Sequence, residues 1–480
     1  MTNSLNRLTL AILVGFAAVA LSLTYWGVFA SDSMYARQDN PRLIENERAI
    51  KRGRIYDRNG QILVDTVQSG VSPSNKPLWA RIYPNLEAVS VVGYYSLNYG
   101  VGGAEAAFDK ILRGDDLTDP VQVSMDRMLH RVQTGSDVRL TIDLNLQKTI
   151  VEAFAGRKGA AILIDVPSGK VLAMVSLPTF DPALLSIPDQ DLLESTYKKL
   201  SIDPAAPLIN RVTGGVYQPG GALQTVILAA MLTQKLSLNA PVTNAEAPLH
   251  VNGLTLTCGA PNPALMIKSA YALGCPSPFA DAVVNQPGPS AVQAMIQAFG
   301  LLQAPTLVSF KTLTGPPPTP LQNITDTARL LAEGAGQADL TVTPLQMALV
   351  VTTIANRGGA ITPYLADAIR RPDSSEWQLL TVPKVQTAVL TQDVTESMRT
   401  AMAFAVTVGA AKAAQQPGLT IYGHASIAYT GPKQNADSWF LGFVDLPGGH
   451  SVAVAVVVED TADPSVAAGI GGKALAGAAK

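Results

Sequence analysis

The sequence has little charge, few histidines and only two cysteines. Charged residues make up 15% of the 480 positions and the formal net charge is −2, which indicates neither a basic nucleic-acid-binding surface nor an acidic tail. The four histidines are scattered, and no residues follow a metal-ligand spacing, so we expect no metal and no cofactor. There is also no repeat of fixed period and no low-complexity tract.

One long apolar run stands near the N-terminus. Residues 8–30 carry no charge and are long enough to cross a bilayer of roughly 30 Å. Arg7 is the only charged side chain before the run, which places residues 1–7 in the cytoplasm. A cleaved signal peptide is the alternative, but its apolar core is usually shorter. We therefore expect a single-pass protein of the cell membrane, with the chain after Ser31 extracytoplasmic.

The two cysteines, Cys258 and Cys275, fit an oxidising compartment. A disulfide between them would contribute about 3 kcal/mol on the loop-entropy account. The alternative is a pair of buried free thiols. We favour the disulfide, because the segment after Leu256 has the composition of an irregular loop.

The remainder divides near residue 135. Residues 31–135 are the more polar part, and Asn59-Gly60 between two apolar runs predicts a β-hairpin there. Residues 136–480 alternate expected strands and helices, with one hairpin at 159–176 and two further strands near the C-terminus. A helix is expected after Thr343, with Pro344 in its first turn. These elements predict one sheet built from both ends of this part, with helices packed on it.

The segment VYQPGGALQTVILAAML, residues 216–232, predicts a loop that opens into a buried helix. Such a junction suits a catalytic nucleophile, because the helix N-terminus offers unpaired N–H groups and a partial positive charge. Here the junction holds Gly221, Ala222, Leu223 and Gln224, none of which can attack a substrate. We expect the helix to begin at Gly221.

Several segments together resemble the class B penicillin-binding proteins, which are membrane-anchored peptidoglycan transpeptidases. The resemblance is carried, in order, by RGRIYDRNGQILVDT (52–66), VVGYYSLNYGVGGAEAAFDKILRG (91–114), NRVTGGVYQPG (210–220), GQADLTVTPLQMA (336–348), ANRGG (355–359) and DSWFLGF (437–443). It implies an α+β, β-lactamase-like transpeptidase domain over 136–480, with a mostly antiparallel sheet, helices on both faces and a helical subdomain. It also implies a β-rich pedestal or dimerisation-like domain over 31–135.

The chemistry of that family rests on three motifs: Ser-x-x-Lys, Ser-x-Asn and Lys-Thr-Gly, which supply nucleophile, proton network and carboxylate binding. All three are degenerate in this chain. The positions that correspond to their key residues hold Gly221 and Gln224, then Gly274 and Pro276, then His424, Ala425 and Ser426. The resemblance therefore implies no catalytic residue at any of them.

Other residues near these positions have plainer interpretations. Tyr429–Gly431 resembles Lys-Thr-Gly but has no lysine. Lys311–Gly315 also resembles that motif but lies far in sequence from the expected strand in DSWFLGF (437–443). Thr225 is expected to face the core, and Ser277 to lie in a loop. His424 is expected to serve packing or the surface.

Three functions remain open. The first is a catalytically silent homologue that acts as a scaffold or regulator of cell-wall synthesis, contacting a SEDS-type glycosyltransferase. The second is an active transpeptidase or carboxypeptidase with displaced catalytic residues. The third is a module that binds peptidoglycan stem peptides without cutting them. For the first we expect Gly221, Gly274 and His424 to face one shared neutral groove. We also expect that returning Ser and Lys to positions 221 and 224 changes stability by no more than about 1 kcal/mol and restores no activity.

Overall fold

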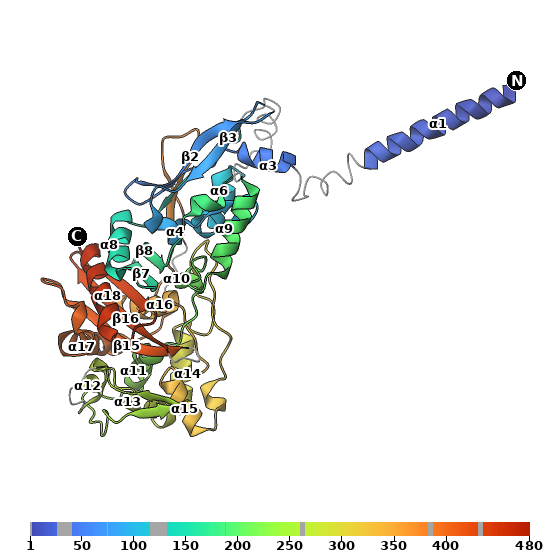
Figure 1. The fold of residues 1–480 in the computed structure, drawn as a ribbon. Coiled ribbons are helices and arrows are strands. Elements are labelled where there is room, and N and C mark those ends of the chain that lie inside the picture. The colour runs from blue at the N-terminus through green and yellow to red at the C-terminus, as the bar shows by residue number, and fades with distance from the viewer. Residues whose placement is uncertain are drawn as a thin grey trace.

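The computed structural model of the chain describes residues 2–25, 41–73, 75–115, 132–187, 189–259, 265–382, 387–430 and 435–480. Helix α1 (Thr2–Thr24) lies apart from the remainder of the chain (Figure 1). Within the described ranges, no helix is both long and apolar enough for a membrane crossing. Residues 26–40, which include the end of the expected membrane segment, lie outside these ranges, as does Gly431.

A six-stranded sheet forms the part of the molecule that lies towards α1. Its strand order is β13-β12-β6-β1-β2-β3, with bounds β1 Ile55–Tyr56, β2 Ile62–Val71, β3 Pro77–Ile82, β6 Asp137–Leu140, β12 Ala366–Arg370 and β13 Gln378–Leu379. The expected hairpin joins β1 to β2, and the Asp57 carboxylate accepts the N–H groups of Asn59 and Gln61 in its turn. Strands β12 and β13 enter this sheet from far along the chain, so it draws on both sides of the boundary expected at residue 135.

Short helices and two short strands complete this region around a buried cluster in which Arg52 and Arg81 both pair with Glu105. Its elements are α3 Pro41–Arg48, η2 Leu86–Ala88, α4 Val89–Val92, β4 Tyr95–Ser96, β5 Gly100–Val101, α5 Gly103–Ala107 and α6 Asp109–Arg113. The Glu105 carboxylate in α5 receives Arg52 at 2.8 Å and Arg81 at 2.6 Å, and all three side chains are buried. Because a buried charge is tolerated only when paired, this cluster ties α5 to strand β3 and to the segment before β1.

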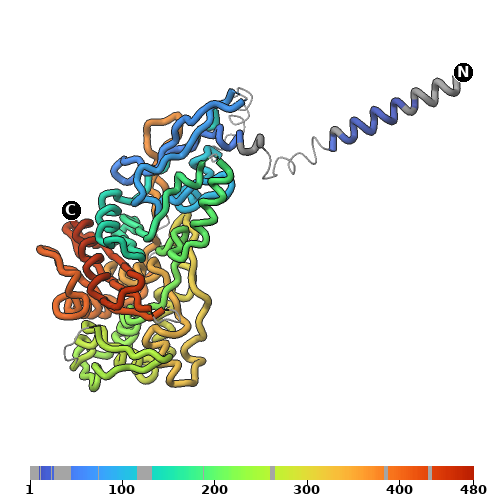
Figure 2. The backbone as a smooth tube through the Cα atoms, in the orientation of Figure 1, coloured from blue at the N-terminus to red at the C-terminus, as the bar shows by residue number. Residues whose placement is uncertain are grey.

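A second, five-stranded antiparallel sheet carries the remainder. Its order is β15-β16-β17-β7-β8, with bounds β7 Gly159–Val166, β8 Val171–Leu177, β15 Ile421–Thr430, β16 Asn435–Leu446 and β17 His450–Val458. Strand β17 pairs with β7 from Ser451↔Val166 to Val458↔Gly159. Segments from the two ends of this region therefore lie side by side, as the colours of Figure 2 show. The prediction of one sheet assembled from both ends is confirmed.

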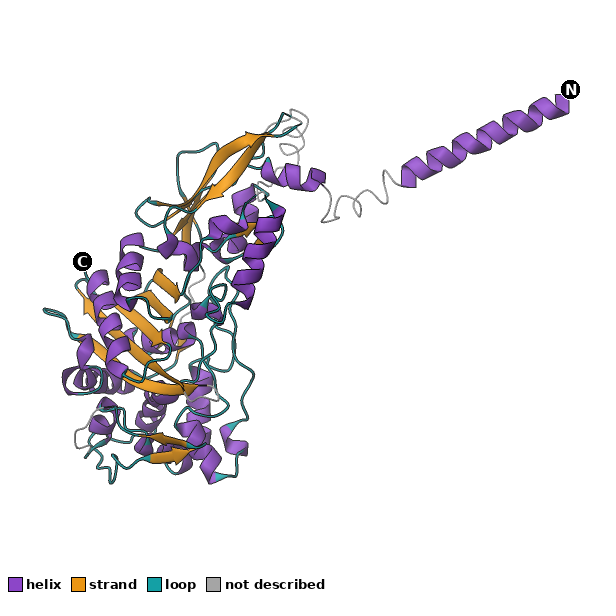
Figure 3. Cartoon of the chain, viewed as in Figure 1, coloured by secondary structure: helices purple, strands orange, loops and turns teal. Residues whose placement is uncertain are grey.

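Helices cover both faces of this sheet (Figure 3). Along β17, Ala453, Ala455 and Val457 join the core that contains α16 (Pro344–Ala355), while the alternate valines join the core beneath α8 (Leu144–Phe154) and α18 (Pro464–Ala478). This follows from the period of two along a strand. Thr343 and Gln346 form the capping box that starts α16, as the Thr-Pro pattern predicted.

Residues 182–202 pack beside β4 and β5, where Tyr197 stacks on Tyr99, and the other remaining elements lie around the five-stranded sheet and the motif positions. The elements are η3 Pro182–Leu185, α9 Gln190–Ile202, α10 Arg211–Gly214, η4 Gly220–Leu223, α11 Gln224–Thr233, β9 Leu249–Val251, β10 Leu254–Leu256, α12 Ile267–Ala272, α13 Ser277–Val284, α14 Pro289–Ala298, η5 Leu321–Asn323, α15 Thr327–Gly334, β11 Gly359–Ala360, β14 Thr387–Ala388, α17 Gln392–Val408 and η6 Lys412–Ala414. The α+β fold predicted by the resemblance is confirmed. The structure also bonds Cys258 to Cys275, as expected.

Candidate functional site

The loop-to-helix junction begins with a tight turn. Residues Gly220–Leu223 form a 3₁₀ turn, and the α-helix α11 starts only at Gln224, so the expected start at Gly221 is wrong by three residues. Pro219 precedes the turn and offers no side-chain acceptor for the first N–H groups. The N–H of Ala222 therefore bonds to the carbonyl of Pro219 at 3.0 Å, the tighter pattern that satisfies uncapped helix starts. Residues 224–232 are all buried, as predicted.

The three degenerate motif segments meet at this turn. His424 on β15 places Nε2 3.1 Å from the carbonyl oxygen of Gly221. Gln224 extends Nε2 to 3.4 Å from the carbonyl oxygen of Cys275. A Cβ on Gly274 would lie 3.5 Å from the carbonyl oxygen of Ala425. Positions widely separated in sequence are thus assembled into one site, as the resemblance expects.

The site is closed. The side chains of Gln224, His424 and Ser426 are 2%, 1% and 4% exposed, so they cannot line an open groove. A Cβ built on Gly221 would lie 2.7 Å from Cβ of Ser426, a distance that real Cβ atoms do not show. The expected shared groove is therefore wrong: the space above Gly221 is filled by the β15 side chains that replace Lys-Thr-Gly.

His424 is a packed, neutral side chain. Its ring stacks on Tyr271 with centroids 4.3 Å apart and an interplanar angle of 17°. Because the Gly221 oxygen only accepts, Nε2 carries the proton of the neutral imidazole. Burial lowers the pKa of His424 from 6.5 to about 4, and the carbonyls of Gly221 and Tyr271 oppose this only in part. A neutral, buried imidazole cannot replace a lysine ammonium in binding a substrate carboxylate.

The site contains no coupled nucleophile and base. Gln224 has an amide, which does not take up a proton from a neighbouring hydroxyl. Among the described residues, Gln224 Oε1, His424 Nδ1 and Ser426 Oγ have no hydrogen-bond partner. The Ser426 hydroxyl is thus not activated by a neighbouring base, and it is buried. A nucleophile needs both activation and access.

The other residues considered as candidates make structural contacts or lie in an exposed loop. Thr225 is fully buried, and its hydroxyl lies 3.1 Å from the hydroxyl of Tyr271. Ser277 starts α13 and donates to the carbonyl of Ala247 at 2.8 Å. Tyr429 lies on β15, where its N–H bonds to the Gln337 side chain. Lys311 lies in an exposed loop before the prolines.

The surroundings of the site retain a dense polar and aromatic framework. The Glu459 carboxylate accepts Arg211 Nε at 2.6 Å and the Tyr217 hydroxyl at 2.9 Å. Trp439 packs edge-on against Tyr217, and its indole N–H bonds to the carbonyl of Gln218 at 3.3 Å. This framework holds the turn against the sheet without using the lost motif residues.

Two contributions could not be assigned from the sequence. Ser426 fills the space that a side chain at position 221 would need, and Tyr271 supplies the platform for His424. The sequence did carry a hint of the role of Ser426: the serine of the family's first motif is missing at position 221, and a serine replaces the glycine of Lys-Thr-Gly at position 426. Asp437, beside the site on β16, is also notable: burial raises its pKa to about 6, with Glu459 and Asp460 adding to the rise.

The comparisons identify the class. The penicillin binding protein transpeptidase domain matches residues 159–476, and the penicillin binding protein A dimerisation domain matches residues 52–138. The chain belongs to the penicillin-binding protein family, and the resemblance read from its motifs is confirmed.

Two of the relatives match nearly the whole length of this chain. The peptidoglycan D,D-transpeptidase PbpA of Mycolicibacterium smegmatis is 31% identical over 98% of this chain and 96% of its own length. The PbpA of Mycobacterium tuberculosis has the same identity and coverage. A solved penicillin-binding protein A from M. tuberculosis, a ceftriaxone acyl-enzyme complex, superposes with a TM-score of 0.80 at 27% identity, covering 91% of this chain and all of that one.

Proposed function

We propose that this chain is a catalytically inactive penicillin-binding protein that serves cell-wall synthesis as a scaffold or regulator. One observation carries the proposal: the family nucleophile position is Gly221, and Ser426 and His424 fill the space above it. A hydrolase that loses its nucleophile loses about 10⁶ in rate, and further losses at the same site add little. Once the serine is gone, nothing preserves the lysine, the asparagine or the open cleft.

The retained fold supports a non-catalytic role. The two sheets, the Glu459 framework and the buried Glu105 cluster are all intact, although none of them requires catalysis. We propose that residues 8–30 anchor the chain in the cell membrane and that the remainder is extracytoplasmic. The Cys258–Cys275 disulfide supports that compartment. A SEDS-type glycosyltransferase, reached through the anchor and the region of the six-stranded sheet, is the partner that we propose.

The alternatives have less support. An active transpeptidase with displaced residues would need Thr225 or Ser277 as nucleophile, and these hydroxyls instead bond to the Tyr271 hydroxyl and the Ala247 carbonyl. A module that holds stem peptides in the old cleft would need an open groove beside β15, where the side chains of His424 and Ser426 are buried.

The test combines two measurements on the purified chain with one on crosslinked membranes. Fluorescent penicillin should leave no label on a denaturing gel, which separates the proposal from an active enzyme. Calorimetry with muropeptides should give no heat of binding, which separates it from a peptide-binding module. Co-purification of the membrane-embedded glycosyltransferase with the chain is the positive result; failure to recover it from crosslinked membranes would contradict the scaffold role.

A further inference from the structure

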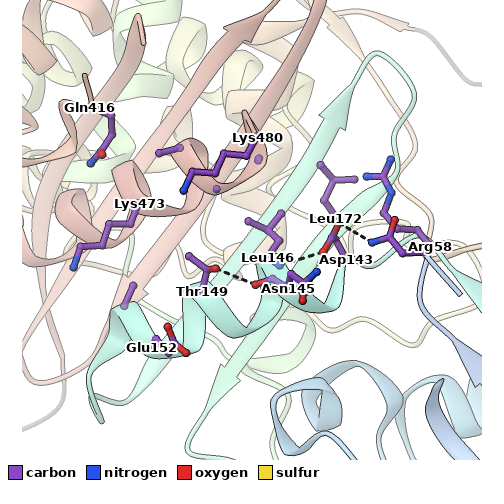
Figure 4. Close-up of a pocket in the computed structure, with 15 residues that line it drawn as sticks. Arg58, Asp143, Asn145, Leu146, Thr149, Glu152, Leu172, Gln416, Lys473 and Lys480 are labelled. Carbon is purple, nitrogen blue, oxygen red and sulfur yellow. Dashed lines mark hydrogen bonds between the residues drawn. The ribbon is translucent and has the colours of Figure 1, made fainter. Parts of the chain in front are cut away.

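The hollow between α8 and the end of α18 is balanced in charge (Figure 4). Its cations are Arg58, Lys473 and Lys480, and they are matched by Asp143, Glu152 and the terminal carboxylate. The corner where β16 begins is different, because carboxylates outnumber cations there. In this corner the first residues of β16 meet the turn at 459–461, which follows β17.

The corner contains three carboxylates and two cations. The carboxylates are those of Asp437, Glu459 and Asp460, and the cations are Lys158 and Arg211. Arg211 Nε lies 2.6 Å from the Glu459 carboxylate, and Lys158 Nζ lies 2.8 Å from that of Asp460. Both cations are therefore engaged by the turn. In the described part of the chain, no ion pair reaches Asp437.

The other elements that pack on the start of β16 do not pair with Asp437 either. Across the ladder, Ala428 of β15 lies opposite it, and Thr430 at the end of β15 offers a hydroxyl. Helix α18 packs on β16, and its N-cap Asp463 is a further carboxylate, which accepts the N–H of Ser465 at 2.9 Å. Asp437 is thus a carboxylate whose charged neighbours are other carboxylates or cations that already have partners.

Three hydrogen bonds fasten the start of β16 to the turn. The N–H of Asp460 donates to the Asp437 carboxylate at 3.1 Å, and the Asn435 side chain donates to the Asp460 carboxylate at 2.7 Å. The N–H of Thr461 donates to the carbonyl of Ala436. With these contacts made, Asp437 is only 4% exposed, although it lies near the end of its strand. An opening of the corner would break these bonds and give Asp437 access to water.

An ionised Asp437 is poorly accommodated in the closed corner. Burial disfavours a charge that has no counter-ion, and like charges nearby disfavour it further. Burial raises the pKa of Asp437 from 3.8 to about 6, and Glu459 and Asp460 add to the rise. The N–H of Asp460 and the hydroxyl of Thr430 oppose the rise only in part. The charge of Asp437 therefore changes at a pH well above the range in which an exposed carboxyl titrates.

We propose that this corner is a pH-sensitive clamp: a protonated Asp437 holds the start of β16 on the 459–461 turn, and an ionised Asp437 loosens it. The ionised carboxylate regains its hydration only if the corner opens, whereas the neutral acid loses little by staying buried. The clamp holds the β15–β16 end of the sheet, and β15 carries the side chains that fill the space above Gly221. It operates whether or not the chain is catalytically silent.

The test is hydrogen–deuterium exchange of the full chain in detergent at pH 5 and pH 8, with rates corrected for the intrinsic pH dependence by unstructured reference peptides. Fragments from residues 435–442 report on the clamp, and fragments from β8 report on the rest of the sheet. D437N removes the change of charge and keeps the size of the side chain. Its matched control is D445N, which makes the same substitution at the exposed far end of β16. Thermal melting checks that each variant folds.

In wild type and D445N, corrected exchange in residues 435–442 should be about tenfold faster at pH 8 than at pH 5, as follows from the pKa of about 6 in the closed corner and 3.8 in the open one. D437N should show no such step and should stay protected at pH 8. Equal wild-type protection at both pH values would overturn the proposal, as would a step that persists in D437N. A step of the same size in β8 would show global loosening and would overturn it too. If D437N melts early, D437S takes its place.

Discussion

Returning a serine to position 221 should destabilise the protein. The structure places Cβ of such a residue 2.7 Å from Cβ of Ser426 and 3.3 Å from its hydroxyl oxygen. Neither Cβ can rotate away, because each is fixed by its backbone: Gly221 lies in η4, and Ser426 pairs with Trp439 in the sheet. The sequence alone predicts that returning Ser and Lys together to positions 221 and 224 changes stability by no more than about 1 kcal/mol, and the contact with Ser426 contradicts the serine part of that prediction.

The magnitude follows from overpacking. Forcing extra atoms into a packed interior costs about 1–3 kcal/mol, so we expect G221S to lose about 2 kcal/mol of unfolding free energy. G221A should lose a similar amount, since the Cβ and not the hydroxyl makes the contact. G70S is the matched control: it places the same side chain on a strand glycine with no atom within 4 Å, and its stability should equal that of the wild type.

The double variant G221S/S426G makes the prediction sharper. Removing the Ser426 side chain opens the space that a serine at 221 needs, so the second substitution should recover most of the loss caused by the first. A double-mutant cycle from urea unfolding should give a favourable coupling of about 1–2 kcal/mol. If G221S unfolds at the wild-type urea concentration, or if the two effects add without coupling, the steric account of the closed site is refuted.

Three further predictions concern titratable and covalent groups. The pKa of His424 is about 4 in the folded protein and 6.5 in the unfolded chain. The free energy of unfolding should therefore be at its full value above pH 6.5 and should fall by up to about 3 kcal/mol as the pH drops through 4. Urea unfolding of H424N should show no such pH dependence. Asp437 acts in the opposite direction, because its pKa is about 6 in the folded protein and 3.8 in the unfolded chain. Its contribution to stability is present at low pH and lost as the pH rises through 6, so D437N should melt at a higher temperature than wild type at pH 8 and at the same temperature at pH 3.5. An equal difference in melting temperature at both pH values would contradict this prediction. A thiol titration of the denatured, unreduced protein should find no free thiol, and two free thiols would show that the disulfide is absent. C258S/C275S should lose about 3 kcal/mol of unfolding free energy.

The sequence predicted the elements that local chemistry decides. Asn59-Gly60 specified a hairpin turn, Thr343 and Pro344 specified a helix start, and the apolar run after Gln224 specified a buried helix. The motif order was enough to identify the family, because each segment keeps its place relative to the others. The meeting of Gly221 and His424, 203 residues apart, followed from that alignment.

Distances across the site could not be read from the same patterns. Whether the cleft is open depends on how far the η4 backbone lies from β15, and a list of missing residues contains no such distance. The entry of β12 and β13 into the six-stranded sheet was missed for a similar reason. These strands are short and sit far from their partners in sequence, so only tertiary packing decides where they pair.

The most direct test of the account is the intact mass of the chain after incubation with penicillin G. The M. tuberculosis penicillin-binding protein A, which has been solved as a penicillin G acyl-enzyme complex, is the positive control. With Gly221 at the nucleophile position, the mass of this chain should remain unchanged while the control gains one acyl group. A stable gain of one acyl group on this chain, mapped by peptide digestion to Thr225, Ser277 or any other hydroxyl, would contradict the account.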